Sequence, residues 1–399
     1  AQMLLVTLAL ISGLYMAWSI GANDVANAVG TAVGSGALKL RRAVIIAGVF
    51  EFLGAWLFGQ EVTQTIQKGI IADNAFASDQ WTLAIGMVAC LFATGIWLQL
   101  ATYWGWPVST THSIVGAVVG FACASVGYQA IKFSALLFIA SSWILSPLVG
   151  GIIGFLVFYT FRQNIFYARH PLRRLKRIGP CLAIFLLFSL SFMLLATRWS
   201  GFSFPIKIAI VFLLSASSLL LAWFIRKYIA RRLVAVEALP KEERPFVDAG
   251  FSSAISHLEE IKKHAHSEQI TLIERRIDEL KALGSQVARS THHVEIQEVE
   301  RIFSRFQVIS ASFMAFSHGA NDVSNAVGPL AAALRAIEIS KNIPMSWLLV
   351  LGAIGIVAGL AIWGWKVIET VGKKITALTP SRGFSAEFSC ACTVLFCAQ

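Results

Sequence analysis

Long apolar runs divide this chain, and they limit its fold more than any other feature of the sequence. A run of about 20 apolar residues is long enough to cross a lipid bilayer as a helix. Because 56% of the 399 residues are hydrophobic and only 14% are charged, an ordinary soluble enzyme and a disordered chain are both excluded. The pattern predicts an all-α polytopic membrane protein. Runs that reach or approach the required length cover residues 3–20, 43–58, 82–101, 133–161, 181–197, 206–225, 306–316, 346–365 and 383–398.

Charged residues gather in one polar segment. Residues 226–305 carry 14 of the 33 Lys and Arg residues and 13 of the 22 Asp and Glu residues, so the positive excess lies on the apolar body. A nucleic-acid-binding protein would carry that excess on its polar domain, so we expect no nucleic-acid partner. The segment is predicted to be helical, because apolar residues recur at helical spacing in Ile270, Ile273, Ile277 and Leu280.

Basic clusters beside the apolar runs predict the orientation. They fall at 39–42, 162–177, 226–232 and 373–382. If each cluster lies in the cytoplasm, the N-terminus lies on the outer side of the plasma or inner membrane. The predicted segments are a first transmembrane repeat (1–161), connecting transmembrane helices with a basic cytoplasmic loop (162–225), a helical cytoplasmic insert (226–305) and a second transmembrane repeat (306–399).

One ten-residue motif occurs twice. Residues 21–30 read GANDVANAVG and residues 319–328 read GANDVSNAVG, which is an internal repeat. The predicted topology makes the apolar runs before the two copies cross in opposite directions, so we expect inverted repeats with a site near the membrane midplane. A helix break is expected at each copy, where glycines allow unwinding and a proline follows the second copy, at Gly21, Gly30, Gly319, Gly328 and Pro329.

The motif is rich in oxygen ligands. A carboxylate with amide and main-chain oxygens suits a hard cation such as Na⁺, although an Asn-Asp pair can also cap a half-helix. Two copies at membrane depth favour the ion site, because polar residues there are costly unless they have a function. The predicted Na⁺ ligands are Asn23, Asp24, Asn27, Asn321, Asp322 and Asn325.

A second polar segment, GWPVSTTHSIVG, covers residues 105–116. Pro107 interrupts the preceding helix, and the hydroxyls of Ser109, Thr110 and Thr111 then lie at the start of a new one. A helix N-terminus of this kind binds anions, although Ser109 is also an ordinary N-cap residue. The apolar stretch 113–126 is too short to span and predicts a re-entrant hairpin. Since neither motif contains Lys or Arg, the sequence favours cation-coupled anion transport over enzymatic activity.

These motifs resemble the inorganic phosphate transporter (PiT) family, which includes the type III sodium/phosphate cotransporters. The resemblance rests on GANDVANAVGTAVGSGAL, HGANDVSNAVGP, PVSTTH and TPSRGFSAE, and it covers nearly all of both apolar halves. It implies that phosphate binds between the halves, with Na⁺ nearby. The implied phosphate-binding residues are Asn23, Asp24, Ser109, Thr110, Thr111, Asn321 and Asp322.

The resemblance also bears on the coupling ion and on the length of the chain. One family branch couples phosphate to protons and carries His-Asp where this chain has Asn23 and Asp24, so sodium coupling is favoured. The family has a second PxSTTH hairpin that is missing here, and we expect the native protein to continue past Gln399.

Three glutamates in or beside apolar runs are candidates either for a further cation ligand or for a paired carboxylate: Glu51, Glu61 and Glu387. The expected partners are inorganic phosphate, Na⁺ or H⁺ and the lipid bilayer, with a homodimer as one candidate assembly and no cofactor beyond the coupling ion. One alternative function is a proton-coupled permease for phosphate, metal-phosphate or sulfate. A membrane-anchored regulatory or receptor protein, with the insert as its active part, is a weaker alternative.

Overall fold

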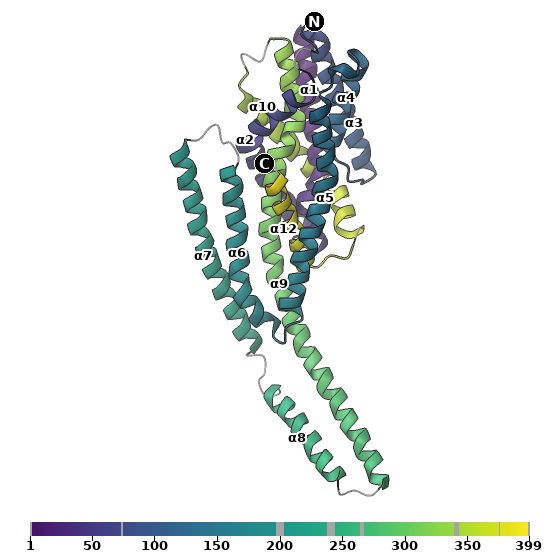
Figure 1. The fold of residues 1–399 in the computed structure, drawn as a ribbon, viewed down its shortest axis with the longest axis vertical. Coiled ribbons are helices and arrows are strands. Elements are labelled where there is room, and N and C mark those ends of the chain that lie inside the picture. Colours follow the sequence, from purple (N-terminus) through teal and green to yellow (C-terminus); the bar gives the residue numbers. More distant parts are fainter. Residues whose placement is uncertain are drawn as a thin grey trace. The chain divides into compact units, whose positions relative to one another are not determined.

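The structure is a computed structural model that describes residues 2–72, 75–196, 203–237, 244–263, 267–338, 343–374 and 376–397. Within these residues helices dominate, and the only β structure is an isolated bridge between Ile71 and Ile131. The predicted all-α class is therefore confirmed. The helices are α1 (Gln2–Gly34), α2 (Leu40–Gly69), α3 (Gln80–Tyr103), α4 (Thr110–Ser125), α5 (Phe133–Phe161), α6 (Pro171–Ala196), α7 (Phe204–Glu237), α8 (Arg244–Lys262), α9 (Ser267–Ala336), α10 (Met345–Trp363), α11 (Trp365–Glu369) and α12 (Pro380–Cys397) (Figure 1).

Six helices are long and apolar enough to cross a membrane, and they lie in α1, α2, α3, α5, α7 and α10. Helix α4 is apolar but has only 16 residues, as expected for half of a hairpin. The remaining predicted runs, which begin at 181, 306 and 383, fall in α6, α9 and α12. The helices thus agree with the predicted membrane protein.

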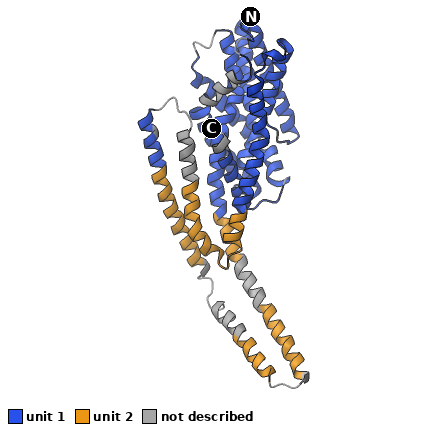
Figure 2. Cartoon of the chain, in the orientation of Figure 1, with its two compact units in different colours: residues 1–158, 188–214, 303–399 blue, residues 159–187, 215–302 orange. Residues whose placement is uncertain are grey.

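The chain divides into two compact units (Figure 2). The first contains residues 1–158, 188–214 and 303–399, and the second contains residues 159–187 and 215–302. Most of the predicted insert, residues 226–302, belongs to the second unit together with the basic ends of α6 and α7. The predicted segment limits at 161, 225 and 305 remain predictions.

Helices α1 and α9, which carry the two motif copies, lie antiparallel in the first unit. At the start of α1, the Gln2 side-chain amide donates to the carbonyl oxygen of Ile337, at the end of α9, over 3.0 Å. At the end of α1, the Ser35 hydroxyl donates to the Gln307 side-chain oxygen over 2.6 Å. The two motif copies therefore run in opposite directions where they meet.

The motif glycines allow close helix crossings that occur once in each half. A Cβ on Gly21 in α1 would lie 1.9 Å from the carbonyl oxygen of Ile356 in α10. A Cβ on Gly319, the equivalent residue in α9, would lie 2.1 Å from the carbonyl oxygen of Glu51 in α2. Only a residue without a side chain fits either position, because the neighbour at each crossing is backbone.

Glycines on the partner helices repeat the same pattern. A Cβ on Gly54 in α2 would lie 1.9 Å from the carbonyl oxygen of Phe316, and one on Gly359 in α10 would lie 1.9 Å from that of Trp18. Under the sequence repeat, Gly54 corresponds to Gly359 and Phe316 corresponds to Trp18. The α1–α10 and α2–α9 crossings are thus two versions of one packing arrangement.

The expected helix breaks at the motif are wrong. Helix α1 continues through residues 21–30 to Gly34, and α9 continues through 319–328 to Ala336 with Pro329 inside it. Among apolar neighbours, an unwound segment would leave main-chain polar groups without partners, so the helix is retained and its glycines serve packing instead. Pro329 has no N–H group and so removes the helical bond to the carbonyl oxygen of Asn325.

Helices α3 and α4 form a helical hairpin, and the re-entrant placement predicted for residues 113–126 remains a prediction. Asp79 caps α3, since its carboxylate accepts from the backbone N–H of Thr82 over 3.0 Å, and hydrogen bonds from Thr82 hold the pKa of Asp79 below its ordinary value. Farther along, α4 packs back on α3 through Phe121. A Cβ on Gly86 would lie 2.0 Å from the Phe121 ring, and this ring also stacks on Phe76 with centroids 5.2 Å apart.

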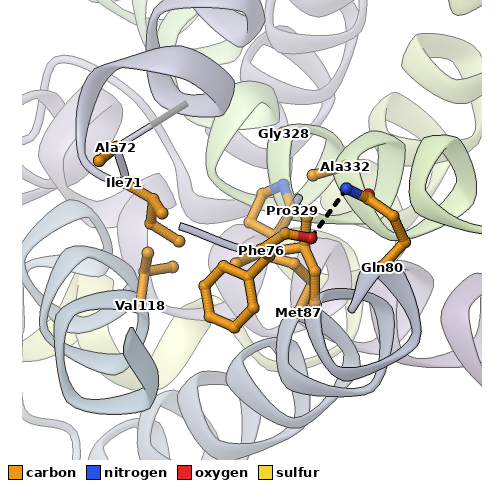
Figure 3. Close-up of a pocket in the computed structure, with 10 residues that line it drawn as sticks. Ile71, Ala72, Phe76, Gln80, Met87, Val118, Gly328, Pro329 and Ala332 are labelled. Carbon is orange, nitrogen blue, oxygen red and sulfur yellow. Dashed lines mark hydrogen bonds between the residues drawn. The ribbon is translucent and has the colours of Figure 1, made fainter. Parts of the chain in front are cut away.

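A cavity of about 140 Å³ lies between this hairpin and α9 (Figure 3). Pro329 and Phe76 line it together with Met87 and Val118, and the Gln80 side chain donates to the Phe76 carbonyl oxygen over 3.0 Å at its edge. Most of the lining is apolar. The cavity therefore lies directly beside the turn of α9 that lacks a main-chain hydrogen bond.

We predict that Gly21→Ala and Gly319→Ala each lower stability by about 1–3 kcal/mol, because the added methyl would force two backbones apart. Thermal unfolding of the purified protein in detergent measures the effect. Gly120→Ala is the matched control, since no atom lies within 4 Å of the new Cβ and alanine favours a helix. Equal melting temperatures for the three variants would contradict the packing role.

Candidate functional site

A polar pocket of about 370 Å³ lies where the two motif helices meet the start of α4. We call it the central pocket, and its lining residues are Asp24, Asn27, Pro107, Val108, Ser109, Thr110, Thr111, His318 and Asp322. It therefore unites both copies of the duplicated motif with the hydroxyl-rich segment, although these stretches are far apart in the sequence.

Acidic groups and a histidine gather at this pocket. Asp24, His318 and Asp322 each place one potential ligand atom within 4.8 Å of the others, an arrangement that could hold a metal ion. The Nε2 atom of His318 lies 2.6 Å from Oδ2 of Asp322, and its Nδ1 atom lies 3.5 Å from Oε1 of Glu51. Asp24 is 3% exposed and Glu51 is fully buried.

Glu51 is the least satisfied of these groups. Neither of its carboxylate oxygens accepts a hydrogen bond within the described part of the chain. A buried carboxylate that accepts no hydrogen bond is costly, so it requires a proton or a nearby cation. His318 is the neighbouring group that can supply positive charge.

An asparagine follows each motif aspartate by one helical turn. The side-chain nitrogen of Asn27 donates to Oδ1 of Asp24 over 3.3 Å, and that of Asn325 donates to Oδ1 of Asp322 over 3.4 Å. Asn325 also lies 3.3 Å from the Thr110 hydroxyl and 3.1 Å from the Thr111 hydroxyl. The second motif copy thus holds the start of α4 directly.

Ser109, Thr110 and Thr111 lie as predicted at the beginning of α4. Ser109 is the N-cap residue, and its hydroxyl accepts from the backbone N–H of His112 over 3.2 Å. The backbone N–H groups of Thr110 and Thr111 belong to the first turn and have no acceptor among the described residues. Capping and anion binding are compatible here, because the cap uses only one of the first-turn donors.

The polar side-chain atoms of Asn23 form hydrogen bonds with the end of α3 and with the connection between α3 and α4. Its side-chain nitrogen donates to the Thr102 hydroxyl over 2.9 Å and to the Trp106 carbonyl oxygen over 3.0 Å. Its side-chain oxygen accepts from the backbone N–H of Val108 over 3.1 Å. Asn23 therefore fixes the connection between α3 and α4, and its predicted ligand role remains a prediction.

Asn321, the equivalent of Asn23 in the second copy, is exposed and does not line the central pocket. Its side chain makes no hydrogen bond among the described residues. The repeat therefore gives these two asparagines different surroundings, and the ligand role predicted for Asn321 also remains a prediction.

His318 is a site residue that the sequence reasoning missed. The sequence does indicate this residue, because the second copy of the repeat differs from the first at this position. Ser19 matches Ser317 and Gly21 matches Gly319, but between them Ile20 corresponds to His318. A polar residue that replaces an apolar one inside a repeated apolar helix is a candidate for function.

Glu387 lies in a separate buried cluster between α1, α9 and α12. The Thr31 hydroxyl donates to its Oε1 atom over 2.5 Å, and the Gln307 side-chain nitrogen donates to the same atom over 3.1 Å. The Ser310 hydroxyl donates to Oε2. These bonds fit the paired-carboxylate interpretation, whereas the side chain of Glu61 lies outside the described residues.

The central pocket has the chemistry of a combined cation and anion site. Carboxylate and amide oxygens are ligands for hard cations, and the start of α4 offers hydroxyl and N–H donors to an anion. No Lys or Arg is among its described lining residues. An anion beside ionised Asp24 and Asp322 would be repelled, so its binding requires positive charge or protons at the carboxylates.

Apolar helices long enough to span a membrane thus surround a buried polar pocket, an arrangement typical of polytopic membrane transport proteins. Residues 20–399 match the model of the phosphate transporter family. The chain is 40% identical over 399 residues to the inorganic phosphate transporter 2-1, chloroplastic, of Arabidopsis thaliana, and it covers 62% of that relative's length. A solved structure described as the sodium-dependent phosphate transporter is 34% identical, with a TM-score of 0.72, covering 98% of this chain and 84% of that one. The chain belongs to the phosphate transporter family.

We predict that Asn23→Ala lowers stability by about 2–3 kcal/mol, because it removes the bonds that hold the α3–α4 connection and leaves partners unsatisfied. Asn321→Ala, at the equivalent exposed position, should change stability by less than about 0.5 kcal/mol. Thermal unfolding in detergent compares the two variants. The anchoring role of Asn23 is rejected if both melt alike.

Proposed function

We propose that this protein imports inorganic phosphate by symport with Na⁺. The observation that carries the proposal is the meeting of Asp24 and Asp322, from antiparallel copies of one motif, with the start of α4 in a single pocket. Membership of the phosphate transporter family and the likeness to a sodium-dependent phosphate transporter support the substrate and the coupling ion.

In this mechanism the motif oxygens bind Na⁺ and the donors of α4 bind phosphate. Asp24 and Asp322, assisted by Asn27 and Asn325, neutralise Na⁺, and the bound Na⁺ then offsets the repulsion between phosphate and the carboxylates. Ser109, Thr110 and Thr111 donate hydrogen bonds to the phosphate oxygens. Each ion favours binding of the other, which is the energetic basis of coupling.

Alternating access would follow from the two halves. Two similar crossings, α1 with α10 and α2 with α9, flank the central pocket, and transporters of inverted-repeat architecture move such halves around a fixed midplane site. The basic clusters favour an N-terminus outside the cell and a cytoplasmic insert, in the plasma or inner membrane. A homodimer is one candidate assembly.

Asp24→Asn and Asp322→Asn should each reduce Na⁺-dependent phosphate uptake by proteoliposomes to background, because a neutral amide cannot neutralise Na⁺. Asp79→Asn is the matched control, since Asn is an equally good N-cap for α3 and the residue lies outside the central pocket. Melting temperatures near that of the wild type show that the variants remain folded. Full uptake by both pocket variants would refute the assigned roles.

Proton coupling on the same scaffold is the second candidate function, and one observation favours it. His318 lies between two carboxylates, Asp322 and Glu51, in a buried position where its side chain is 10% exposed. Such a chain could carry a proton in place of Na⁺.

Separately imposed gradients distinguish the two coupling ions. For sodium coupling we expect radiolabelled phosphate uptake to follow an inward Na⁺ gradient and to stay at background under a pH gradient in sodium-free buffer. Uptake driven by the pH gradient and lost in His318→Gln would instead establish proton coupling. Competition by excess sulfate or by a divalent metal with phosphate identifies the alternative cargoes.

A further inference from the structure

In the second unit, two basic clusters that are 50 residues apart in the sequence lie side by side. A Cβ on Gly179 in α6 would lie 3.0 Å from a side-chain carbon of Ile229 and 3.7 Å from one of Ile225, both in α7. This contact places Gly179, in the first half of α6, beside residues 225–229 of α7. Four exposed arginines flank this contact, and we call them the basic surface: Arg174, Arg177, Arg226 and Arg231.

Two described carboxylates of the unit, Glu295 and Glu298, contact other residues. Glu295 accepts from the backbone N–H of Leu172 over 3.4 Å, and Glu298 lies 2.5 Å from Arg301 and 3.9 Å from Arg232. None of the four arginines of the basic surface forms an ion pair with another described residue. The surface therefore carries four formal positive charges without an ion-pair partner among the described residues.

The basic surface lies where the apolar part of α7 ends. The apolar run of this helix stops at Ile225, immediately before Arg226, and the preceding aromatic residues are outward-facing: Trp223 is 53% exposed and Phe224 is 54% exposed. Lys227 lies over the Trp223 ring, with Nζ 4.8 Å from the centroid. Aromatic rings beside basic side chains are typical of the boundary between lipid tails and headgroups.

We propose that the basic surface binds the headgroups of anionic phospholipids. The phosphate groups of the lipid supply the missing negative charge, and the acyl chains cover the exposed rings of Trp223 and Phe224. Arginine suits this role because its planar guanidinium binds phosphate through two parallel hydrogen bonds. A soluble anion would satisfy the charges but would leave the adjoining rings in water, which is why the combination favours a lipid.

The proposal is independent of the coupling ion and of the central pocket. A cluster of several Lys and Arg residues next to a membrane span is the usual means of recruiting acidic lipids, and each charge contributes appreciably to their retention. Lipid bound here would hold the paired ends of α6 and α7 at the membrane surface.

The test measures retained lipid by native mass spectrometry of the detergent-solubilised protein, offered equal amounts of phosphatidylglycerol and phosphatidylcholine. We expect the wild type to retain phosphatidylglycerol preferentially. The variant R174Q/R177Q/R226Q/R231Q should lose at least about ten-fold of this preference, because four charges are removed. R275Q/R276Q is the matched control, since these arginines of the same unit lie on α9 beside Glu279 and form ion pairs with it.

Further outcomes decide the proposal even if the fourfold variant fails to fold. The wild-type preference should fall as NaCl rises from 50 to 500 mM, since the attraction is electrostatic. Equal retention of both lipids by the wild type, or a preference unchanged by salt, would overturn the proposal. So would an unchanged preference in a folded fourfold variant, or displacement of phosphatidylglycerol by equimolar inorganic phosphate, which would identify a soluble-anion site instead.

Discussion

The cost of placing carboxylates inside an apolar helix bundle governs this structure. A charged group in such surroundings is destabilising by several kcal/mol unless partners compensate it. Asp24 and Asp322 lie close together, and His318 links them to Glu51, so the chain must bring hydrogen-bond donors to the same place. Asn27, Asn325 and His318 supply them from the same helices, and an ion would complete the compensation.

Close packing of the helices brings these carboxylates and their hydrogen-bond donors together. The motif has a glycine at each end and the polar residues between them, and its first glycine lies in backbone contact with a neighbouring helix. Gly21 and Gly319 thereby fix the depth and rotation of Asp24 and Asp322. In each copy the packing glycine and the pocket aspartate thus share one helical turn, Gly21 with Asp24 and Gly319 with Asp322.

Periodicity and apolar length were sufficient to predict the all-α class and the short helix after Pro107. The meeting of both motif copies with Thr110 and Thr111 was implied by the family resemblance. The sequence could not show that the motif helices stay continuous, because glycine permits a break and a close crossing equally well. Only the neighbouring backbone decides between them. The role of Asn23 was hidden for a similar reason, since its partners lie some 80 residues away, in the connection after α3.

The positions at which the two halves of the internal repeat differ are as informative as those at which they are identical. Ile20 and His318 occupy equivalent positions, and the histidine places an ionisable ring against two carboxylates in only one half. The helices around the site are therefore approximately symmetric, but only the second half contributes a histidine. An ion that binds at Asp322 experiences a different field from one that binds at Asp24.

Pro329 gives the two motif helices different mechanical properties. Thr31 occupies the matching position in α1 and keeps its main-chain N–H group. In α9, by contrast, the main-chain hydrogen bond to the carbonyl oxygen of Asn325 is missing. A helix bends most easily at such a turn, and the adjoining cavity gives the backbone space into which to move. We therefore expect α9 to bend more readily than α1. A motion of the site that strains both helices should bend mainly α9.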